Sequence, residues 1–146
     1  MISTIAELIS KIKETNNFLI TEDILNKYDG DDWNEYVKIN ESNYNREKVY
    51  EDDLFEILII TWNVSQKANI HDHSENGCFL KILDGGELDE ILYDNKLNEL
   101  EKKILKKNEI SYMDNNIGYH SIINNSPKIV VSIHIYSPPN HSTKFY

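Results

Sequence analysis

The hydrophobic residues near the amino terminus follow the spacing of a helix. Apolar side chains recur every three or four positions, at Ile2, Ile5, Leu8, Ile9 and Ile12. This spacing predicts an amphipathic helix from about Ser3 to Glu14. Thr21-Glu22-Asp23 is typical of the start of a second helix, and Asp31 stands where it could cap a third. We expect these helices to pack against the rest of the protein.

From Leu54 onward the pattern changes to short apolar runs separated by turn residues. We expect strands at Leu54–Trp62, Cys78–Leu83, Glu87–Tyr93, Ile110–Met113, Tyr119–Ile123 and Ile129–Tyr136. Between the second and third runs, Asp84-Gly85-Gly86 predicts a hairpin turn. The charged stretch Lys96–Lys107 fits a loop, an edge strand or both. Such short strands predict a mainly β protein, an antiparallel barrel or jelly roll with a short N-terminal helical region.

The length favours one domain. For 146 residues we expect a single domain over 1–146, with a helical packing region over about 1–40 and a barrel over about 44–139. Acidic residues outnumber basic ones by 25 to 15, for a net charge of −10. Because no cationic field would attract them, nucleic acids and anionic membranes are excluded as partners.

Targeting features and cysteine content indicate the cellular compartment in which the protein is expected. No apolar run approaches the ~20 residues that cross a bilayer, and the amino terminus lacks the apolar core of a secretory signal. One cysteine, Cys78, excludes an internal disulfide and favours a reducing compartment. We therefore expect a cytoplasmic protein, and a monomer.

The sharpest local feature is His71-Asp72-His73. In a strand, residues two apart point to the same face, so the two imidazoles converge while Asp72 points away. Two adjacent imidazoles form half of a metal site. A pair of surface histidines beside a loop is the alternative.

The surrounding residues resemble the cupin barrels. His71 and His73 match the first cupin motif, with Cys78 standing where cupins usually have a glutamate ligand. Gly118-x-His120 resembles the second motif, whose histidine supplies a third ligand. The resemblance implies that His71, His73 and His120 bind a metal. Three neutral imidazoles would hold Fe(II) on one face and leave about three of six octahedral positions open.

Three segments are more specifically similar to the cysteine dioxygenases: the iron-binding signature Ile70–Lys81, the stretch Ser132–Pro139, and Asn43–Arg46, which resembles the substrate-arginine segment of that family. The similarity runs in order from Tyr44 to Pro139, about two-thirds of the chain. It implies a non-haem thiol dioxygenase, with one Fe(II) per chain and no organic cofactor, that converts L-cysteine and O2 to cysteine sulfinic acid.

Arg46 is the only arginine, and the other fourteen basic residues are lysines. Where a point charge suffices the chain uses lysine, so the lone guanidinium favours a planar, bidentate task such as gripping a carboxylate. A chance surface arginine is the alternative. In the family, arginine at this position distinguishes cysteine users from relatives that act on 3-mercaptopropionate and carry glutamine. The resemblance assigns Arg46 and Tyr44 to the substrate carboxylate.

Ser132, His134 and Tyr136 alternate along one predicted strand, so they share a face. Alone, this pattern favours an ordinary amphipathic strand with its polar face in water. In the family these residues form a relay that points the tyrosine into the active site, and the cysteine that matches Cys78 forms a thioether with it. The resemblance therefore implies that these four residues are catalytic and that a Cys78–Tyr136 thioether forms here.

Some positions depart from the family or have no role in it. The N-terminal helical region is shorter than in animal members, and Thr143 stands where they often have another cysteine. Trp62 matches a family tryptophan near the pocket, but we expect it to be a core residue. We expect His141, which has no assigned partner, to lie on the surface. Two other functions stay open: a dioxygenase for another small thiol such as 3-mercaptopropionate, and a catalytically silent metal-binding cupin that acts as a sensor or interaction module.

Overall fold

The computed structural model describes residues 1–146 as short helices followed by nine strands. The helices are α1 (Ile5–Glu14) and α2 (Thr21–Asn26), with 3-10 turns η1 (Phe18–Ile20) and η2 (Asp32–Tyr36). The strands are β1 (Asn45–Glu51), β2 (Glu56–Trp62), β3 (Lys67–His71), β4 (Cys78–Asp84), β5 (Leu88–Tyr93), β6 (Glu99–Leu105), β7 (Ile110–Met113), β8 (Tyr119–Ile123) and β9 (Val130–Tyr136).

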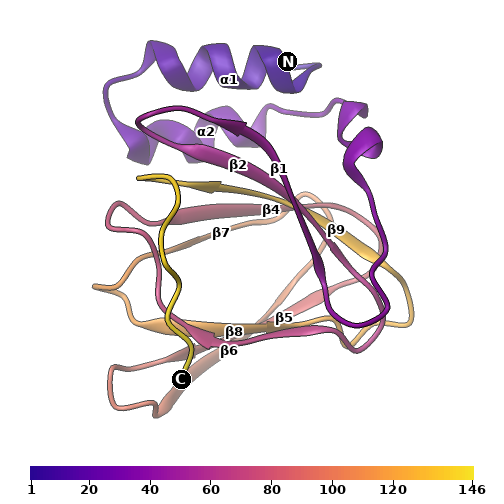
Figure 1. Ribbon diagram of the computed structural model, residues 1–146, viewed down its shortest axis with the longest axis vertical. Helices are drawn as coiled ribbons and strands as arrows, with labels where there is room; N and C mark the ends of the chain where they lie inside the picture. Colours follow the sequence, from indigo (N-terminus) through magenta and orange to yellow (C-terminus); the bar gives the residue numbers. More distant parts are fainter.

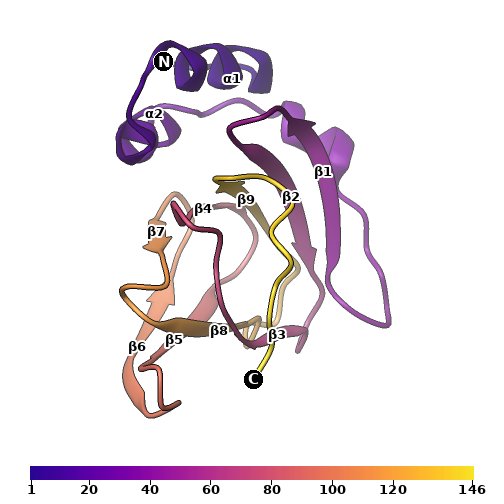
Figure 2. The same ribbon diagram turned by 60° about the vertical axis from the view of Figure 1, so that its left-hand side comes forward.

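The strands form two antiparallel sheets that face each other (Figure 1). The five-stranded sheet has the order β1-β2-β9-β4-β7, and the four-stranded sheet has the order β3-β8-β5-β6. Both α1 and α2 cover the outer face of the five-stranded sheet (Figure 2). The predicted jelly roll with a short N-terminal helical region is confirmed.

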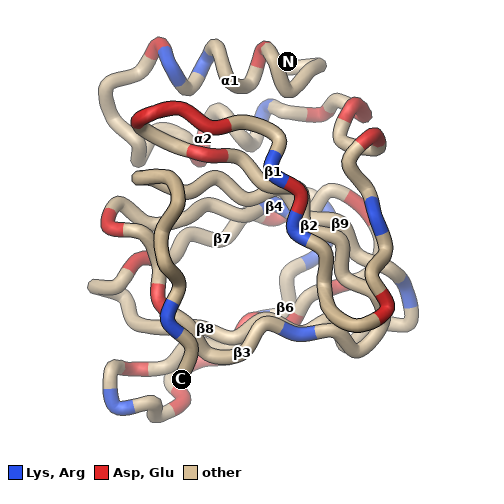
Figure 3. Tube along the Cα trace, viewed as in Figure 1, with Lys and Arg blue, Asp and Glu red and all other residues tan.

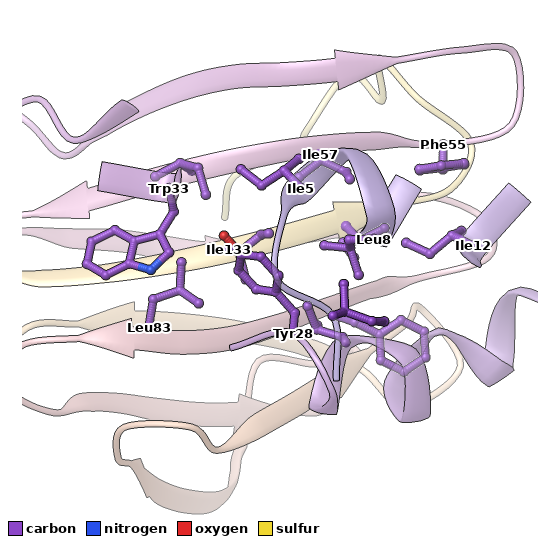
Figure 4. Close-up of a cluster of buried hydrophobic side chains, with 14 of the residues drawn as sticks. Ile5, Leu8, Ile12, Tyr28, Trp33, Phe55, Ile57, Leu83 and Ile133 are labelled. Atoms are coloured by element: carbon purple, nitrogen blue, oxygen red, sulfur yellow. The ribbon is translucent and has the colours of Figure 1, made fainter. Parts of the chain in front are cut away.

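The hydrophobic core has two parts, one on each face of the five-stranded sheet. Outside, α1 places Ile5 and Leu8 against Ile57 of β2 and Ile133 of β9 (Figure 4). Inside, between the sheets, a second cluster includes Leu58, Ile60, Leu80, Ile82 and Ile122. Because side chains alternate along a strand, β2, β4 and β9 contribute to both parts.

A buried lysine ties the helices to the barrel. Lys81 of β4 is 2% exposed, and its Nζ donates to the backbone carbonyls of Leu25, Asn26 and Tyr28, at 3.1, 3.4 and 2.7 Å. Burial lowers the pKa of its ammonium group. A cation at the carboxyl end of a helix is favourable because the last carbonyls have no partner within the helix.

The third helix predicted after Asp31 is present only as the short 3-10 helix η2. Asp31 is at its N-cap position, but its side chain makes no capping hydrogen bond. The adjacent Asp32 is used elsewhere: it accepts hydrogen bonds from the Ile5 N–H at 2.8 Å and the Tyr28 hydroxyl at 2.6 Å. Thr4 is the residue that caps α1, accepting from the Glu7 N–H.

The hairpin predicted at Asp84-Gly85-Gly86 is also wrong. β4 pairs with β7 and β9, whereas β5 pairs with β6 and β8, so the turn carries the chain from one sheet to the other. The glycine is still required, because Gly85 has φ +99° and an added Cβ would collide with the carbonyl oxygen of Ile129. The glycines therefore signal a turn without specifying its partner strand.

The charged segments of the sequence form edge strands of the two sheets. β1 and β3 were not predicted, and both lie at sheet edges; the stretch Lys96–Lys107 contains the edge strand β6. The net negative charge is conspicuous at the turn between β1 and β2, where Glu51, Asp52 and Asp53 follow one another (Figure 3). None of the helices has the length and apolar character needed to cross a lipid bilayer.

Candidate metal centre and substrate pocket

Three imidazoles converge inside the barrel. His71 ends β3 and lies opposite His120 of the neighbouring strand β8, while His73 follows in the loop after β3. Nε2 of His120 lies 2.9 Å from Nε2 of His73 and 3.1 Å from Nε2 of His71. The structure thus brings together the three histidines that sequence analysis selected, with their ligand atoms within 4.8 Å of one another.

The hydrogen bonds of these rings show what the cluster can bind. Nδ1 of His71 lies 2.7 Å from the carbonyl of Asn69, and Nδ1 of His120 lies 2.7 Å from Oε2 of Glu90. Both partners accept, so each Nδ1 carries the proton and each Nε2 presents a lone pair. Burial lowers the pKa of all three imidazoles and keeps them neutral. Converging lone pairs repel unless they share a cation, so this arrangement fits a metal ion.

Glu90 is a supporting residue that sequence reasoning missed. It lies on β5, is 5% exposed, and accepts a hydrogen bond from Oγ of Ser111 at 2.7 Å besides that from His120. Burial raises the pKa of its carboxyl group. A signal existed in the sequence: Glu90 is a charged residue between Leu88 and Leu92, which alternate with it on one strand face.

A second missed residue fixes the loop that carries His73. The side-chain oxygen of Asn115 accepts from the His73 N–H at 2.9 Å, and its amide nitrogen donates to the His73 carbonyl at 3.0 Å. Both backbone groups of the ligand are therefore satisfied by one side chain from the turn between β7 and β8. This pairing has no local sequence signature, since Asn115 resembles any turn asparagine.

A small cavity of about 40 Å³ lies beside the three histidines. The predicted site residues that line it with the histidines are Tyr44, Arg46, Cys78, His134 and Tyr136. None of the ion pairs in the protein involves Arg46. The Tyr44 ring stacks on Trp62, with centroids 4.7 Å apart. The cavity therefore combines a nitrogen-rich end with a guanidinium that no carboxylate of the protein pairs with.

Ser132, His134 and Tyr136 form a connected chain of hydrogen bonds. Trp62 Nε1 donates to Oγ of Ser132 at 2.9 Å, and this hydroxyl lies 2.8 Å from Nε2 of His134. The other nitrogen of the His134 ring, Nδ1, lies 3.2 Å from the Tyr136 oxygen. The series therefore connects Trp62 through Ser132 and His134 to the phenol that lines the cavity.

Burial controls the ionisation of this end of the cavity. It lowers the pKa of His134, an effect to which the Arg46 charge adds, and it raises the pKa values of the Tyr136 phenol and the Cys78 thiol. Cys78 of β4 lies directly opposite Tyr136 of β9 in the sheet. Two side chains in such positions share a face and lie close together.

Two sequence predictions need correction here. Trp62 is buried, as expected of a core residue, but it also lines the cavity and donates to Ser132. The prediction that His141 lies on the surface without a partner is wrong. Its side chain is 27% exposed, lines the cavity, and lies 2.9 Å from Oδ1 of Asp72 through Nε2. A position so near the carboxyl terminus gave no sign of this contact.

Comparison with solved structures defines the class of protein. An uncharacterised protein with a double-stranded β-helix domain from Klebsiella pneumoniae superposes with a TM-score of 0.66, at 17% identity over 77% of this chain and 86% of that one. An RmlC-like cupin family protein from Methanocaldococcus jannaschii gives 0.53, at 19% identity over 70% and 86%. The protein therefore has the cupin fold, and within it a three-histidine metal site.

Sequence comparison narrows the class to a family. The family described as cysteine dioxygenase type I matches residues 2–146. Human cysteine dioxygenase type 1 is 36% identical over 126 residues, which cover 80% of this chain and 62% of the human protein. The bovine protein is 38% identical over 116 residues, 74% of this chain and 58% of its own. The chain belongs to the cysteine dioxygenase type I family, and it spans less than two-thirds of these relatives.

Proposed function

We propose that the protein is a non-haem Fe(II) thiol dioxygenase that converts L-cysteine and O2 to cysteine sulfinic acid. The observation that carries this proposal is one small cavity that joins three convergent imidazole nitrogens to the unpaired guanidinium of Arg46. Such a cavity suits a small ligand with a metal-binding group at one end and a carboxylate at the other. Membership of the cysteine dioxygenase type I family supports the same substrate class.

The reaction balances without a further reductant. The thiol sulfur loses four electrons, O2 gains four, and both oxygen atoms end on sulfur. Fe(II) held by His71, His73 and His120 supplies the one-electron chemistry by which O2 reacts with a thiolate. The contribution of the remaining residues is to bind and orient the reactants.

Arg46, Tyr44 and Tyr136 hold the substrate. Arg46 forms a bidentate pair with the carboxylate, and the hydroxyl of Tyr44 donates to the same group. Tyr136 donates its phenolic hydrogen into the cavity and accepts from Nδ1 of His134, 3.2 Å away, whose other nitrogen contacts Ser132. The raised pKa of the Tyr136 phenol keeps this hydrogen in place at neutral pH.

Cys78 becomes linked to Tyr136 by a thioether in the active enzyme. The side chain of Cys78 is buried and that of Tyr136 is partly buried, and the two residues lie opposite each other on β4 and β9 and share the cavity. The link joins Sγ to a ring carbon and removes two hydrogen atoms, which O2 accepts. We expect the intact protein to become lighter by two hydrogens after exposure to Fe(II), cysteine and air. The variant Cys78→Ser should keep its mass, and a wild-type mass that also stays unchanged would contradict the link.

Oxygen consumption tests the proposed function. Protein loaded with Fe(II) is supplied with L-cysteine, 3-mercaptopropionate or cysteamine, and the products are identified by mass spectrometry. Cysteine sulfinate, formed faster than the other sulfinates, is the expected result. Preference for 3-mercaptopropionate would favour the other thiol dioxygenase, and no uptake with any thiol would favour the silent metal-binding cupin. The cytoplasmic location and the monomeric state stay predictions.

Substituting Arg46 tests the carboxylate grip. Loss of a hydrogen-bonded charge costs about 1.5–3 kcal/mol, so Arg46→Gln should lower kcat/KM for L-cysteine by about 10- to 100-fold, and by less for 3-mercaptopropionate. Lys48→Gln is the matched control, since it removes a cation of the same strand that pairs with Glu51 and Glu56 outside the cavity. Equal losses in the two variants would contradict the role of Arg46.

A further inference from the structure

The chain that follows β9 crosses from one sheet to the other (Figures 1 and 2). Its last residues run beside β3, the strand that ends in the metal ligand His71. The Asp72 N–H donates to the Lys144 carbonyl at 3.1 Å, and the Tyr146 N–H donates to the Ile70 carbonyl at 2.9 Å. The Tyr146 ring stacks on Tyr119 of β8, with centroids 4.6 Å apart. The carboxyl terminus is thus bonded to the edge of the four-stranded sheet.

This segment presents alternate residues to the cavity. His141, Thr143 and Phe145 line it, whereas Ser142 and Lys144 do not. The Phe145 ring lies 5.7 Å from the His71 ring, so the segment reaches the metal centre itself. This alternation is typical of an extended chain, in which every second side chain lies on the same face.

Asp72 holds the segment in this orientation. Its Oδ1 accepts from the Lys144 N–H at 2.8 Å and lies 2.9 Å from Nε2 of His141. One carboxylate between two metal ligands therefore fixes both the backbone of the segment and a side chain that lines the cavity. At the other end, the Asn140 N–H donates to Glu56 at 3.1 Å.

We propose that residues 141–146, here called the C-terminal wall, set the largest thiol that the pocket admits, and that Asp72 is the residue that positions this wall. This inference rests on the proposed function. The cavity is small, about 40 Å³, and His141, Thr143 and Phe145 line it, so a thiol with a longer side chain than cysteine meets the side chains of the wall. The wall thereby restricts turnover to substrates of cysteine size.

The alternation along the wall supplies matched variants. Phe145→Ala and His141→Ala remove atoms from the cavity, while Lys144→Ala and Ser142→Ala remove atoms that face away from it. When a pocket fits its substrate closely, one additional methylene group on the substrate changes kcat/KM by about 10-fold or more. We therefore expect the ratio of kcat/KM for homocysteine to that for L-cysteine to rise about 10-fold in the first pair and to stay constant in the second. Equal ratios in all four variants would overturn the proposal.

A second pair of variants tests the positioning role of Asp72. Asp72→Asn keeps an acceptor oxygen for Lys144 and His141, whereas Asp72→Ala removes it. Hydrogen exchange at the Lys144 amide should accelerate in Asp72→Ala and be largely restored in Asp72→Asn, and the thiol ratio should follow the same order. Iron content is measured in both variants, because Asp72 lies between two ligands. Unchanged exchange in Asp72→Ala would overturn the positioning role.

A binding measurement separates this inference from the proposed function. If the wild-type protein oxidises no thiol, the proposed function fails, and binding of homocysteine without O2 is followed through the fluorescence of Trp62, which lines the cavity. Tighter homocysteine binding by Phe145→Ala than by Lys144→Ala still supports the wall. Identical binding by these two variants contradicts it.

Discussion

Both faces of the five-stranded sheet bury apolar side chains, but on β9 the two faces differ in chemistry. On β9, Val131, Ile133 and Ile135 face outward into the apolar cluster beneath the helices. Ser132, His134 and Tyr136, one position along, face inward and are hydrogen-bonded in series. The outer face stabilises the sheet by burying hydrocarbon, and the inner face uses that rigid support to aim polar groups at the cavity.

The inner face of β9 shows how a row of buried polar side chains, Ser132, His134 and Tyr136, is stabilised. Buried hydroxyl and imidazole groups are costly unless they are bonded, and here Trp62 donates to the first member of the row. A shift of one residue in the register of β9 would exchange the two faces. The outer apolar cluster therefore also fixes the alignment of the relay.

The two sheets also divide the site between them. His71 and His120, which belong to β3 and β8, come from the four-stranded sheet, whereas Arg46 and Tyr136 come from the five-stranded sheet. The metal centre and the substrate-facing residues thus lie on opposite walls of one cavity. Variants of each wall should be separable by experiment.

The largest effect is expected from removing a metal ligand. His120→Ala deletes the imidazole that contacts both other histidines, so iron retention should fall to near zero while the outer face stays intact. Metal analysis after gel filtration measures the iron content, and circular dichroism reports the fold. Iron content equal to that of the wild type would remove His120 from the ligand set.

Variants on opposite faces of β9 test the division between the two faces. Ile133→Ala should lower the free energy of unfolding by about 2–5 kcal/mol, because it leaves a cavity in the outer cluster. Urea denaturation measures this change, and iron content should not move. Tyr136→Phe should do the reverse, lowering kcat about 10-fold or more with little loss of stability. Comparable stability losses in both variants would contradict the division between the two faces.

A variant of Glu90 tests whether this carboxylate supports metal binding by His120. Glu90→Gln weakens the acceptor that orients His120, and loss of such a partner typically lowers metal affinity by about 10- to 100-fold. Competition with a chelator measures the affinity. Ser111→Ala, which removes only the hydrogen bond to the far oxygen of Glu90, is the control and should have a smaller effect. Affinity unchanged in Glu90→Gln would show that the carboxylate has no such role.

The smallest effect concerns the one charged residue embedded beneath the helices. Lys81→Met removes the side-chain donor to the Tyr28 carbonyl and one of two donors to the Leu25 carbonyl, which should cost about 1–3 kcal/mol. Thermal unfolding measures this loss. Turnover of thiol below the unfolding transition should match the wild type, and a loss of turnover there would show that the helices influence the cavity.

The sequence predicted those site residues whose positions depend on neighbouring residues in the same strand. The alternation of Ser132, His134 and Tyr136 follows from the two-residue period of a strand, and Arg46 is conspicuous because it is the only arginine. The strand period also predicted that His71 and His73 converge and that Asp72 points away, but His73 lies in the loop after β3, where Asn115 holds its backbone, and Asp72 lines the cavity. Resemblance to a family was needed to add His120, which is distant in the sequence.

The remaining features depend on which segments lie side by side in space. Glu90, Asn115 and the contact of Asp72 with His141 arise from neighbouring strands and from the crossing of the carboxyl terminus. The turn at Gly85 was recognised, but its backbone geometry does not reveal that the next strand joins the other sheet. β1 escaped prediction because its alternating half-buried and exposed residues include several charges.

Isotopically labelled O2 tests the central claim most directly. The Fe(II)-loaded protein is given L-cysteine under labelled O2, and the product is analysed by mass spectrometry. We expect cysteine sulfinate that carries two labelled oxygen atoms. Sulfinate with at most one labelled atom, or none formed by protein shown to hold Fe(II) at its histidines, would contradict it.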